Sequence, residues 1–541
     1  MSNKTKTEKI VLNVLKAASV MVVAFGMIIF FSLVIGGDKW DVNVACKLPL
    51  MIPNFVLFLT ALVLMAGFAA PIIILKKKNS SSDDSKRVLI ITTIILVLIY
   101  AAWYVINIKI SKKIAFYTGW DPSCVQGTAY SLFDGGKIGS EVYYSAYPNN
   151  IPMAWILYRS LDFIKRFQGY PYYSEFFWIQ ILCALESLTG IVLGITSYIS
   201  TKKIFPVVLS TILYLALIGI SPWSIIPYTD TFSILFPILG LCFYFLYLEM
   251  KKNVKYVVLF AACFLIAVGS LIKITVIIVL ISIVLSEIIR IVFLKRESIK
   301  RMAIVAALVL SVIPLYFGMK TVTYKDTGAE LLDNLSVSWQ HYFYMGLIEE
   351  TTGAYNSDAF SLIGQYQFSP KAERSQKELE LAKEIIDERG FVKSVLFYLK
   401  KLVMTYNDGT FTWRGEGGVK YGDYPDISSE SFREVLRSFY WNGGERELVF
   451  NTYSQFIWIW ILLGFLISSV SFSIRLFKEK TVDFMSFTSL LSIVGITLFI
   501  MLFEARARYL YNFVPIFILL CSSGIYNFSK NFGKKKKDAS V

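Results

Sequence analysis

The feature that most constrains this chain is a succession of apolar runs, each long enough to cross a lipid bilayer. The runs are continuous rather than alternating, which favours membrane-spanning helices over barrel strands. Hydrophobic residues make up 55% of the chain, far above a soluble domain. The sequence therefore predicts an all-α polytopic membrane protein of about 12 spans. They lie near residues 10–36, 50–75, 88–107, 174–198, 204–222, 228–249, 254–271, 273–294, 302–319, 452–474, 482–503 and 509–528.

Clusters of lysine and arginine border these spans on one side. They lie at 76–78, 86–87, 202–203, 251–252, 295–301, 478–480 and 534–537. Because basic loops are retained in the cytoplasm, the pattern predicts a multi-pass plasma-membrane protein with both termini inside. The formal charge of +15 then reflects topology, and without a recognisable motif we expect no nucleic-acid partner.

Two long segments fall outside the membrane in this topology, at 108–173 and 320–451. Within them, 151–166 reads as an interfacial segment and Pro370–Arg389 as a mixed-charge surface helix. The chain then divides into four parts. These are an N-terminal transmembrane hairpin (1–87), a transmembrane core carrying the first outer loop (88–319), an outer loop domain (320–451), and C-terminal transmembrane helices with a basic tail (452–541).

Several kinds of site are not supported by the sequence. The chain has a single histidine and no Cys/His cluster with zinc spacing, so no structural metal is predicted. No phosphate-binding P-loop and no dinucleotide glycine motif is present. Cys46 and Cys124 both lie outside in the predicted topology and could pair, although two cysteines prove little.

The first outer loop contains two candidate catalytic carboxylates, Asp121 and Asp134. Asp121-Pro122 is typical of a helix start and Gly135-Gly136 of a helix end. A cap can also fix a carboxylate in place, so Asp121 is a candidate general base that accepts a proton from a hydroxyl. Asp134 lies where the helix dipole opposes a carboxylate. It is either a solvated turn residue or a group that orients an acceptor or supports a cation.

Three further candidates for substrate binding are amides and a lysine at predicted membrane boundaries. Asn149 and Asn150 either cap the next segment or bind sugar or phosphate oxygens. Lys273 interrupts the apolar stretch 254–294, which is too long for one span and is expected to turn near Gly269-Ser270. Its ammonium either reaches the interface by its long stem or binds a lipid phosphate.

The remaining candidates are His341, Glu504, Arg506 and Arg508. His341 lies in an aromatic segment and is either a packing residue or a ligand for phosphate or sugar. Glu504 and Arg508 could form an ordinary i,i+4 pair. Two arginines at an outer helix end oppose the positive-inside trend, and guanidinium groups match phosphate geometry. Glu186 lies inside a predicted span, where a carboxylate usually has a function.

In order and sidedness, these features resemble the GT-C superfamily of integral-membrane glycosyltransferases, in particular bacterial relatives of the protein O-mannosyltransferase and aminoarabinose transferase families. Asp121 lies in the first large outer loop, and Tyr147-Pro148-Asn149-Asn150 begins the next segment. Trp339–Leu347, together with Gly353–Asp358, looks like a stretch of Gram-positive members, and Glu504–Leu510 looks like their "E.R.RY" element. Two departures are the Gln340-His341 order and the extra spans before residue 88.

The resemblance implies a GT-C-like bundle with two large extracytoplasmic loops and an inverting sugar transfer. The donor would be a sugar on a polyprenyl phosphate, and the acceptor a cell-wall or teichoic polymer, a glycolipid or a protein. Asp121 would activate the acceptor, while the arginines, Lys273 and His341 would hold the phosphate. Some families also use a divalent cation such as Mg²⁺ or Mn²⁺ near the equivalent aspartate. The sequence leaves that requirement open.

Two other classes remain open from the sequence. A lipid-linked sugar flippase or other carrier could use the same basic residues to bind phosphate, although a carrier should place functional groups near mid-membrane within a repeat. A scaffold for wall synthesis would tolerate replacement of Asp121. The large outer loops and the gathering of candidate residues on one face favour the enzyme.

Overall fold

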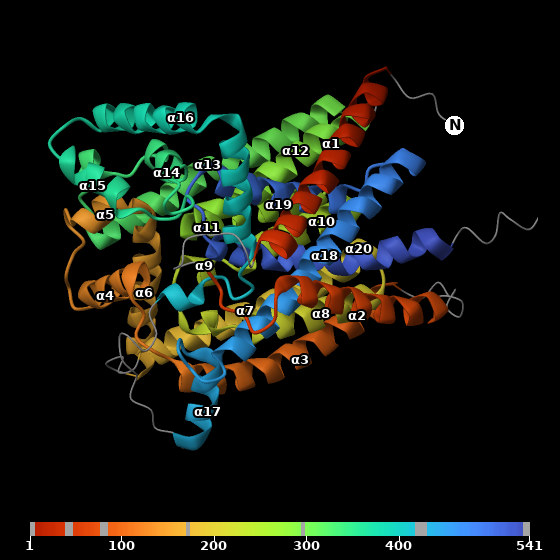
Figure 1. Ribbon diagram of the computed structural model, residues 1–541, viewed down its shortest axis with the longest axis horizontal. Helices are drawn as coiled ribbons and strands as arrows, with labels where there is room; N and C mark the ends of the chain where they lie inside the picture. Colours follow the sequence, from red (N-terminus) through yellow and green to blue (C-terminus); the bar gives the residue numbers. More distant parts are fainter. Residues whose placement is uncertain are drawn as a thin grey trace, which may run out of the picture.

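The computed structural model describes residues 6–37, 47–75, 85–168, 174–293, 298–416 and 430–533. These residues form a helical bundle (Figure 1), and the β-bridge recorded within them is an isolated one between Gly139 and Ala329. The long bundle helices are α1 (Lys6–Phe31), α2 (Asn54–Leu75), α3 (Ser85–Ile114), α7 (Ser174–Thr201), α8 (Ile204–Tyr214), α10 (Leu235–Glu249), α11 (Lys255–Ile272), α12 (Ile277–Phe293), α13 (Ser298–Thr327), α18 (Glu447–Glu479), α19 (Phe484–Leu502) and α20 (Val514–Gly533).

The predicted class, an all-α polytopic membrane protein, is confirmed. The described residues contain 10 helices long and apolar enough to cross a membrane, each at a predicted span. At the other two predicted spans, 50–75 and 204–222, they contain the shorter apolar helices Asn54–Met65 and Ile204–Gly219. Large apolar side chains such as Ile94 and Leu98 of α3 are exposed, as expected for a surface that faces lipid.

Three spans are longer than the sequence predicted. The helices at 88–107, 302–319 and 452–474 extend over Arg87–Ile114, Met302–Thr327 and Glu447–Glu479. Their extra turns carry polar and charged residues, whose long stems let a helix continue through the interface. The two outer segments are correspondingly shorter than 108–173 and 320–451.

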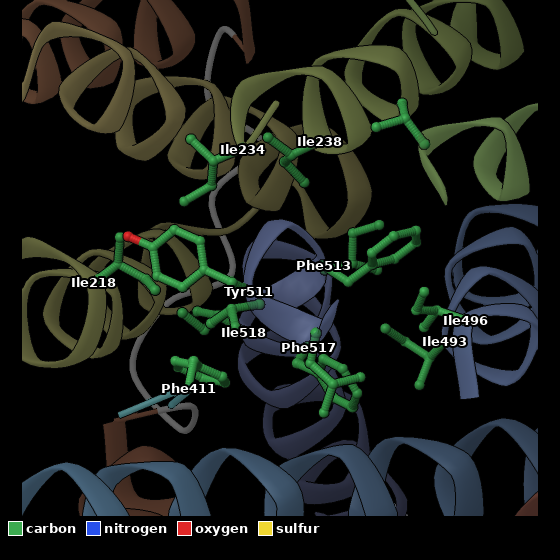
Figure 2. Close-up of a cluster of buried hydrophobic side chains, with 14 of the residues drawn as sticks. Ile218, Ile234, Ile238, Phe411, Ile493, Ile496, Tyr511, Phe513, Phe517 and Ile518 are labelled. Atoms are coloured by element: carbon green, nitrogen blue, oxygen red, sulfur yellow. The ribbon is translucent and has the colours of Figure 1, made fainter. Parts of the chain in front are cut away.

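The centre of the bundle is the pair α18 and α20, which approach closely through small residues. A Cβ added at Gly464 of α18 would lie 2.1 Å from Cys521 Sγ, and one at Gly524 of α20 would lie 2.4 Å from Ser468 Cβ. Such contacts let helix backbones pack tightly where lipid removes the usual hydrophobic driving force. Figure 2 shows the adjoining core, in which the Phe517 ring of α20 packs against Trp458 and Phe465 of α18 at 5.2 and 5.5 Å between ring centres.

The predicted N-terminal hairpin is packed onto the same axis. Ser19 of α1 hydrogen-bonds Ser473 of α18 at 3.0 Å, and the Met51 amide donates to Thr452 Oγ1 of α18 at 2.9 Å. The first two helices therefore cover α18, the central helix of the bundle.

The shorter helices gather at one end of the bundle, which we call the site pole (Figure 1). The N-terminal end of α1 and the C-terminal end of α20 lie toward the opposite end, so both ends of the described chain share a pole. The shorter elements are α4 (Trp120–Phe133), α5 (Val142–Ala146), η3 (Pro148–Asn150), α6 (Ile151–Gln168), α9 (Thr229–Phe232), α14 (Trp339–Met345), α15 (Ser357–Gln365), η8 (Trp413–Glu416), α17 (Glu430–Tyr440) and η10 (Ala507–Phe513). The 36-residue helix α16 (Lys371–Tyr406) begins at the same pole.

The predicted helices of the outer segments are present. α6 covers the expected 151–166, and α4 runs to Phe133, after which Gly135 has a φ of +90°. The predicted surface helix at 370–389 forms the first limb of α16, which breaks at Gly390 (φ 65°, ψ 177°) and then continues. Only glycine adopts that conformation readily, so Gly390 sets the change of direction visible in Figure 1.

Candidate functional site

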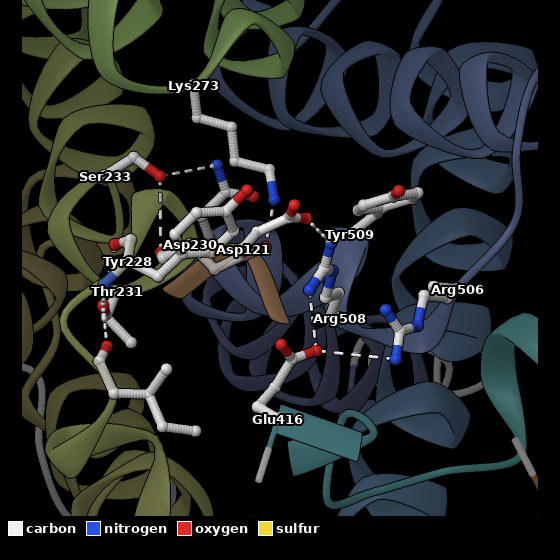
Figure 3. A network of polar contacts seen from close by, with 12 residues as sticks. Asp121, Tyr228, Asp230, Thr231, Ser233, Lys273, Glu416, Arg506, Arg508 and Tyr509 are labelled. Carbon is white, nitrogen blue, oxygen red and sulfur yellow. Dashed lines mark hydrogen bonds and ion pairs between the residues drawn. The ribbon is translucent and has the colours of Figure 1, made fainter. Parts of the chain in front are cut away.

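Charged side chains from distant parts of the sequence meet near the site pole (Figure 3). We call this group the charge cluster. It draws on the start of α4, on α9, on the junction between α11 and α12, on η8, and on η10 with the extended residue that precedes it. Its members are Asp121, Asp230, Lys273, Glu416, Arg506 and Arg508.

Glu416 and Arg508 form the buried centre of the cluster. Arg508 Nη1 donates to Glu416 Oε1 at 2.6 Å, and Arg506 Nη2 lies 3.5 Å from the same oxygen. The Glu416 carbonyl accepts from the Gly119 amide at 2.9 Å, which ties η8 to the start of α4. Because a buried charge is costly without a partner, the two arginines and this carboxylate hold one another in place.

Asp121 sits beside this centre and keeps access to solvent. Its Oδ2 lies 3.8 Å from Arg508 Nη2, and its side chain is 35% exposed. Its Oδ1 accepts from Tyr143 Oη at 2.9 Å, and Tyr143 Oη accepts from Asn150 Nδ2 at 2.8 Å. Burial, the neighbouring Tyr228 and the Asp121 charge raise the pKa of Tyr143, so it remains a donor that fixes the carboxylate.

The predicted amides therefore belong to the surroundings of Asp121. Asn149 Nδ2 donates to Asn150 Oδ1 at 3.2 Å, and Tyr228 Oη donates to the same oxygen at 3.3 Å. Asn150 is buried, and its Nδ2 donates to Tyr143 Oη and so helps to orient this tyrosine. Asn149 is exposed at this position.

Lys273 is paired with Asp230, and both are buried. The chain breaks at Lys273 itself (φ −143°, ψ 114°) and not at Gly269-Ser270 as predicted. Gly269 lies within α11. A Cβ at this position would lie 2.5 Å from Phe236 Cβ, so the glycine allows close packing. The Lys273 ammonium lies 5.0 Å from the centre of the Tyr509 ring, where a cation is attracted by the ring face.

Several buried polar atoms of this region have no hydrogen-bond partner within the described residues. They are Asp230 Oδ2, Glu416 Oε2, Arg508 Nε and Asn512 Oδ1. An unsatisfied buried polar group costs roughly 1–3 kcal/mol and asks for an explanation. Here these atoms surround one group of charges, which is the arrangement expected where a polar ligand completes the bonding.

The backbone on both sides of the cluster is strained. Trp120, directly before Asp121, has a φ of +52° and is 64% exposed. Phe411 and Thr412, shortly before Glu416, have φ values of +57° and +60°. Left-handed conformations cost L-residues energy, most of all a β-branched threonine, and they concentrate at functional sites.

A carboxylate inside the loop holds the second strained segment. Asp408 accepts from the Thr410 amide at 2.8 Å, from Thr410 Oγ1 at 2.6 Å and from the Thr412 amide at 2.8 Å. Trp223 Nε1 adds a bond to the Thr410 carbonyl at 3.1 Å. These bonds fix the path of the chain that delivers Glu416 to the arginines.

Two details of the predicted local geometry are wrong. The residue that caps α4 is Gly119, and Asp121 lies in the first turn, where the helix dipole still favours a carboxylate. Glu504 and Arg508 do not form an i,i+4 pair, because the chain from Phe503 to Arg506 is extended. Glu504 instead accepts from Tyr509 Oη at 2.8 Å.

Two predicted site residues lie apart from the charge cluster. Asp134 is exposed at the far end of α4, which places it about 20 Å along the helix from Asp121 at 1.5 Å per residue. His341 is buried, and its Nδ1 lies 2.9 Å from Glu378 Oε1 of α16. The roles predicted for these two residues remain predictions, because neither residue lies beside Asp121 in the structure.

Sequence reasoning missed Asp230 and Glu416. Asp230 begins the predicted span 228–249, so the rule that an ionisable residue in an apolar run is functional could have found it. Glu416 ends the short helix η8, and its partner Arg508 lies 92 residues away in the sequence, so no local pattern marks it. The same rule did single out Glu186, whose carboxylate accepts from Asn107 Nδ2 at 3.1 Å and from Tyr511 Oη at 3.1 Å.

The part of the chain that the structure describes contains no group of three or more His, Cys, Asp or Glu residues placed to hold a metal ion. Asp121 has a tyrosine hydroxyl on one oxygen and a guanidinium near the other. These neighbours do not fit a dedicated divalent-cation site. The possible pairing of Cys46 with Cys124 falls outside the described residues, since Cys46 is not among them.

A buried lysine ties the outer helices to the segment that carries the arginines. Lys401 Nζ of α16 donates to the carbonyls of Gly346, Met501 and Phe503 at 2.6, 3.0 and 2.7 Å. These carbonyls belong to the ends of α14 and α19, where a cation is favoured. Burial nevertheless lowers the pKa of Lys401 to about 7.

This lysine predicts a stability that rises with pH. Between about 7 and the unfolded value of about 10.4, the unfolded chain holds a proton that the folded chain has released. The free energy of unfolding therefore increases with pH in this window, by a few kcal/mol at about 1.4 kcal/mol per pKa unit. Lys401→Met should flatten this dependence in thermal unfolding of the detergent-solubilised protein, whereas Lys400→Met should keep it. A slope that survives in Lys401→Met would contradict the assignment.

The fold and the cluster together define a polytopic α-helical integral membrane protein whose charged groups gather near one pole. A family model described as "conserved hypothetical integral membrane protein" matches residues 14–527. The chain belongs to this family. A comparison with curated proteins finds no match.

Proposed function

We propose that this protein is a membrane glycosyltransferase that moves a sugar from a polyprenyl-phosphate donor to an acceptor outside the plasma membrane. The observation that carries the proposal is Asp121, a partly exposed carboxylate placed 3.8 Å from a buried arginine. One group is suited to accept a proton, and the other to receive a phosphate. Their proximity is what a displacement at a sugar–phosphate bond requires.

The proposed reaction balances with these residues alone. Asp121 accepts the proton of the acceptor hydroxyl while that oxygen forms a bond to the anomeric carbon. The bond from that carbon to the phosphate oxygen breaks, so the configuration inverts and polyprenyl phosphate leaves with an added negative charge. Arg508, Arg506 and Lys273 stabilise this charge.

The unpartnered atoms support the same arrangement. Arg508 Nε is a donor without a partner in the described structure, and a phosphate oxygen would complete its bonding. The ring of Tyr509 beside Lys273 gives an apolar wall for the first part of a lipid chain. In the proposed orientation the site pole faces outward and both termini face the cytoplasm.

The test is a transfer assay with the full-length protein in liposomes that contain polyprenyl-phosphate donors with labelled sugars. Label that moves into a water-soluble or lipid acceptor, with inverted anomeric configuration, is the expected result. A carrier would instead move labelled donor between leaflets without breaking the sugar–phosphate bond. Labelled donor that crosses the bilayer intact, with no product, would replace the transferase proposal by the carrier.

A further inference from the structure

A cavity lies between the N-terminal parts of α14 and α16. Its volume is 760 Å³, within the range of about 300–1,000 Å³ typical of ligand sites. No carboxylate is among the residues that line it. They are Val337, Ser338, Trp339, Gln340, Lys371, Ala372, Ser375, Gln376 and Leu379.

This lining combines an aromatic plane with hydrogen-bonding groups. Trp339 is 58% exposed, so part of its ring is open to a ligand. Gln340 and Gln376 supply amides that both donate and accept, and Lys371 supplies a cation. A flat apolar surface ringed by amides and hydroxyls suits a sugar ring, whose faces are apolar and whose edges carry hydroxyl groups.

The floor of the cavity is a buried network, which gives it a fixed shape. Ser375 Oγ donates to Ser338 Oγ at 3.2 Å, and Ser338 Oγ donates to Glu378 Oε2 at 3.3 Å. His341 contacts the other oxygen of Glu378, and Arg374 binds the Asn334 and Ser336 carbonyls, each at 2.6 Å. The single histidine of the chain thus supports this cavity from below.

The wall of the cavity is tied to the helix that orients Asp121, because the Val337 amide donates to the carbonyl of Ala146, the last residue of α5, at 3.1 Å. The same helix carries Tyr143, which donates to Asp121. α14 has seven residues, about 10 Å at 1.5 Å per residue, and carries Trp339 at its start. Burial and then the charges of Glu504 and Asp121 raise the pKa of Tyr342, one residue after His341.

Aromatic rings continue from Asp121 toward the outside. The Tyr143 ring lies 5.5 Å from Tyr147, Tyr147 stacks on Phe360 at 5.9 Å, and Phe360 lies 6.2 Å from Tyr355. Tyr355 is 48% exposed. These rings provide further sugar-binding faces between solvent and Asp121.

We propose that the cavity between α14 and α16 binds a glycan chain, and that the acceptor of the proposed transferase is therefore an oligosaccharide or polysaccharide. The identity of the acceptor rests on the proposed function, whereas the binding of a glycan does not. Sugar rings held on Trp339 would place the end of the chain beside Asp121.

The test is direct binding of chitohexaose, cellohexaose and maltohexaose to the purified protein by calorimetry and saturation-transfer NMR. At least one hexasaccharide should bind, and Trp339→Ala and Gln376→Ala should each weaken it, the tryptophan change by about tenfold. Phe368→Ala, which removes an aromatic ring that is 94% exposed and does not line the cavity, is the matched control and should bind as wild type does.

The outcomes separate the two proposals. Binding by wild type that Trp339→Ala does not weaken, or no binding of any of the three probes, would overturn the glycan site. If the probe binds as expected and no sugar transfer occurs, the glycan site stands and the transferase proposal fails.

Discussion

Asp121→Asn should lower sugar transfer by about 10²–10⁴-fold, the usual contribution of a positioned general base. Asparagine can still accept the hydrogen bond from Tyr143 Oη that Asp121 accepts at 2.9 Å, but it cannot take a proton from an acceptor. The Arg508–Glu416 bond at 2.6 Å is independent of this change, so we expect the fold and the expression level to be retained. The measurement is initial rate in the liposome transfer assay at matched protein amounts.

Asp134→Asn is the matched control for this prediction. It removes the same charge from the exposed end of the same helix and should leave transfer within about twofold of wild type, as for most surface changes away from a site. Equal rates for wild type and Asp121→Asn would remove Asp121 from the chemistry. A large loss in Asp134→Asn would restore the role that the sequence suggested for it.

Arg508→Lys should lower transfer by about 10²–10³-fold, the range for loss of one preorganised donor to a developing anion. Lysine keeps a positive charge for the buried Glu416 and so avoids the penalty of an unpaired carboxylate. It cannot supply the planar fork or the Nε donor that Arg508 leaves without a partner. Rates and thermal unfolding should be measured on the same preparation, to separate lost chemistry from lost structure.

Arg506→Lys gives the comparison within the same segment. Arg506 is 21% exposed and approaches Glu416 only to 3.5 Å, so we expect a loss of less than tenfold. If the two lysine variants lose transfer equally, the phosphate is held by both arginines and Arg508 has no special place. If Arg508→Lys keeps full activity, the proposed phosphate contact is wrong.

The helices were predictable because they depend on local apolar runs. Each 18-residue stretch of apolar side chains must satisfy its backbone within itself in lipid, and the chain supplied such stretches at the expected places. The ends were less predictable, since lysines at 109, 112 and 113 continue α3 beyond its apolar part. The turn predicted near Gly269 was wrong, because glycine at this position serves a packing contact with Phe236 and not a turn.

The site was predictable in part, for a related reason. Asp121, Lys273 and Arg508 are charges that interrupt or border apolar runs, and such charges stand out in a sequence. Glu416 stands in a polar segment, where a carboxylate attracts no notice. Its importance arises only from the fold, which buries it against two arginines. His341 was predicted to bind substrate because it is the single histidine. Its contact with Glu378 of another helix depends on the fold and could not be read from the sequence.

The charge cluster joins residues that are synthesised far apart in time. Asp121, Asp230 and Lys273 are made before α12, whereas Arg508 is made just before the last helix. Until this segment is made, Glu416 lacks the guanidinium groups that neutralise it. The face of α18 that packs against α20 is also uncovered. A ribosome that stopped after α19 would therefore release a chain with its spans in place but its charges uncompensated, a form that quality-control proteases could distinguish from the finished protein.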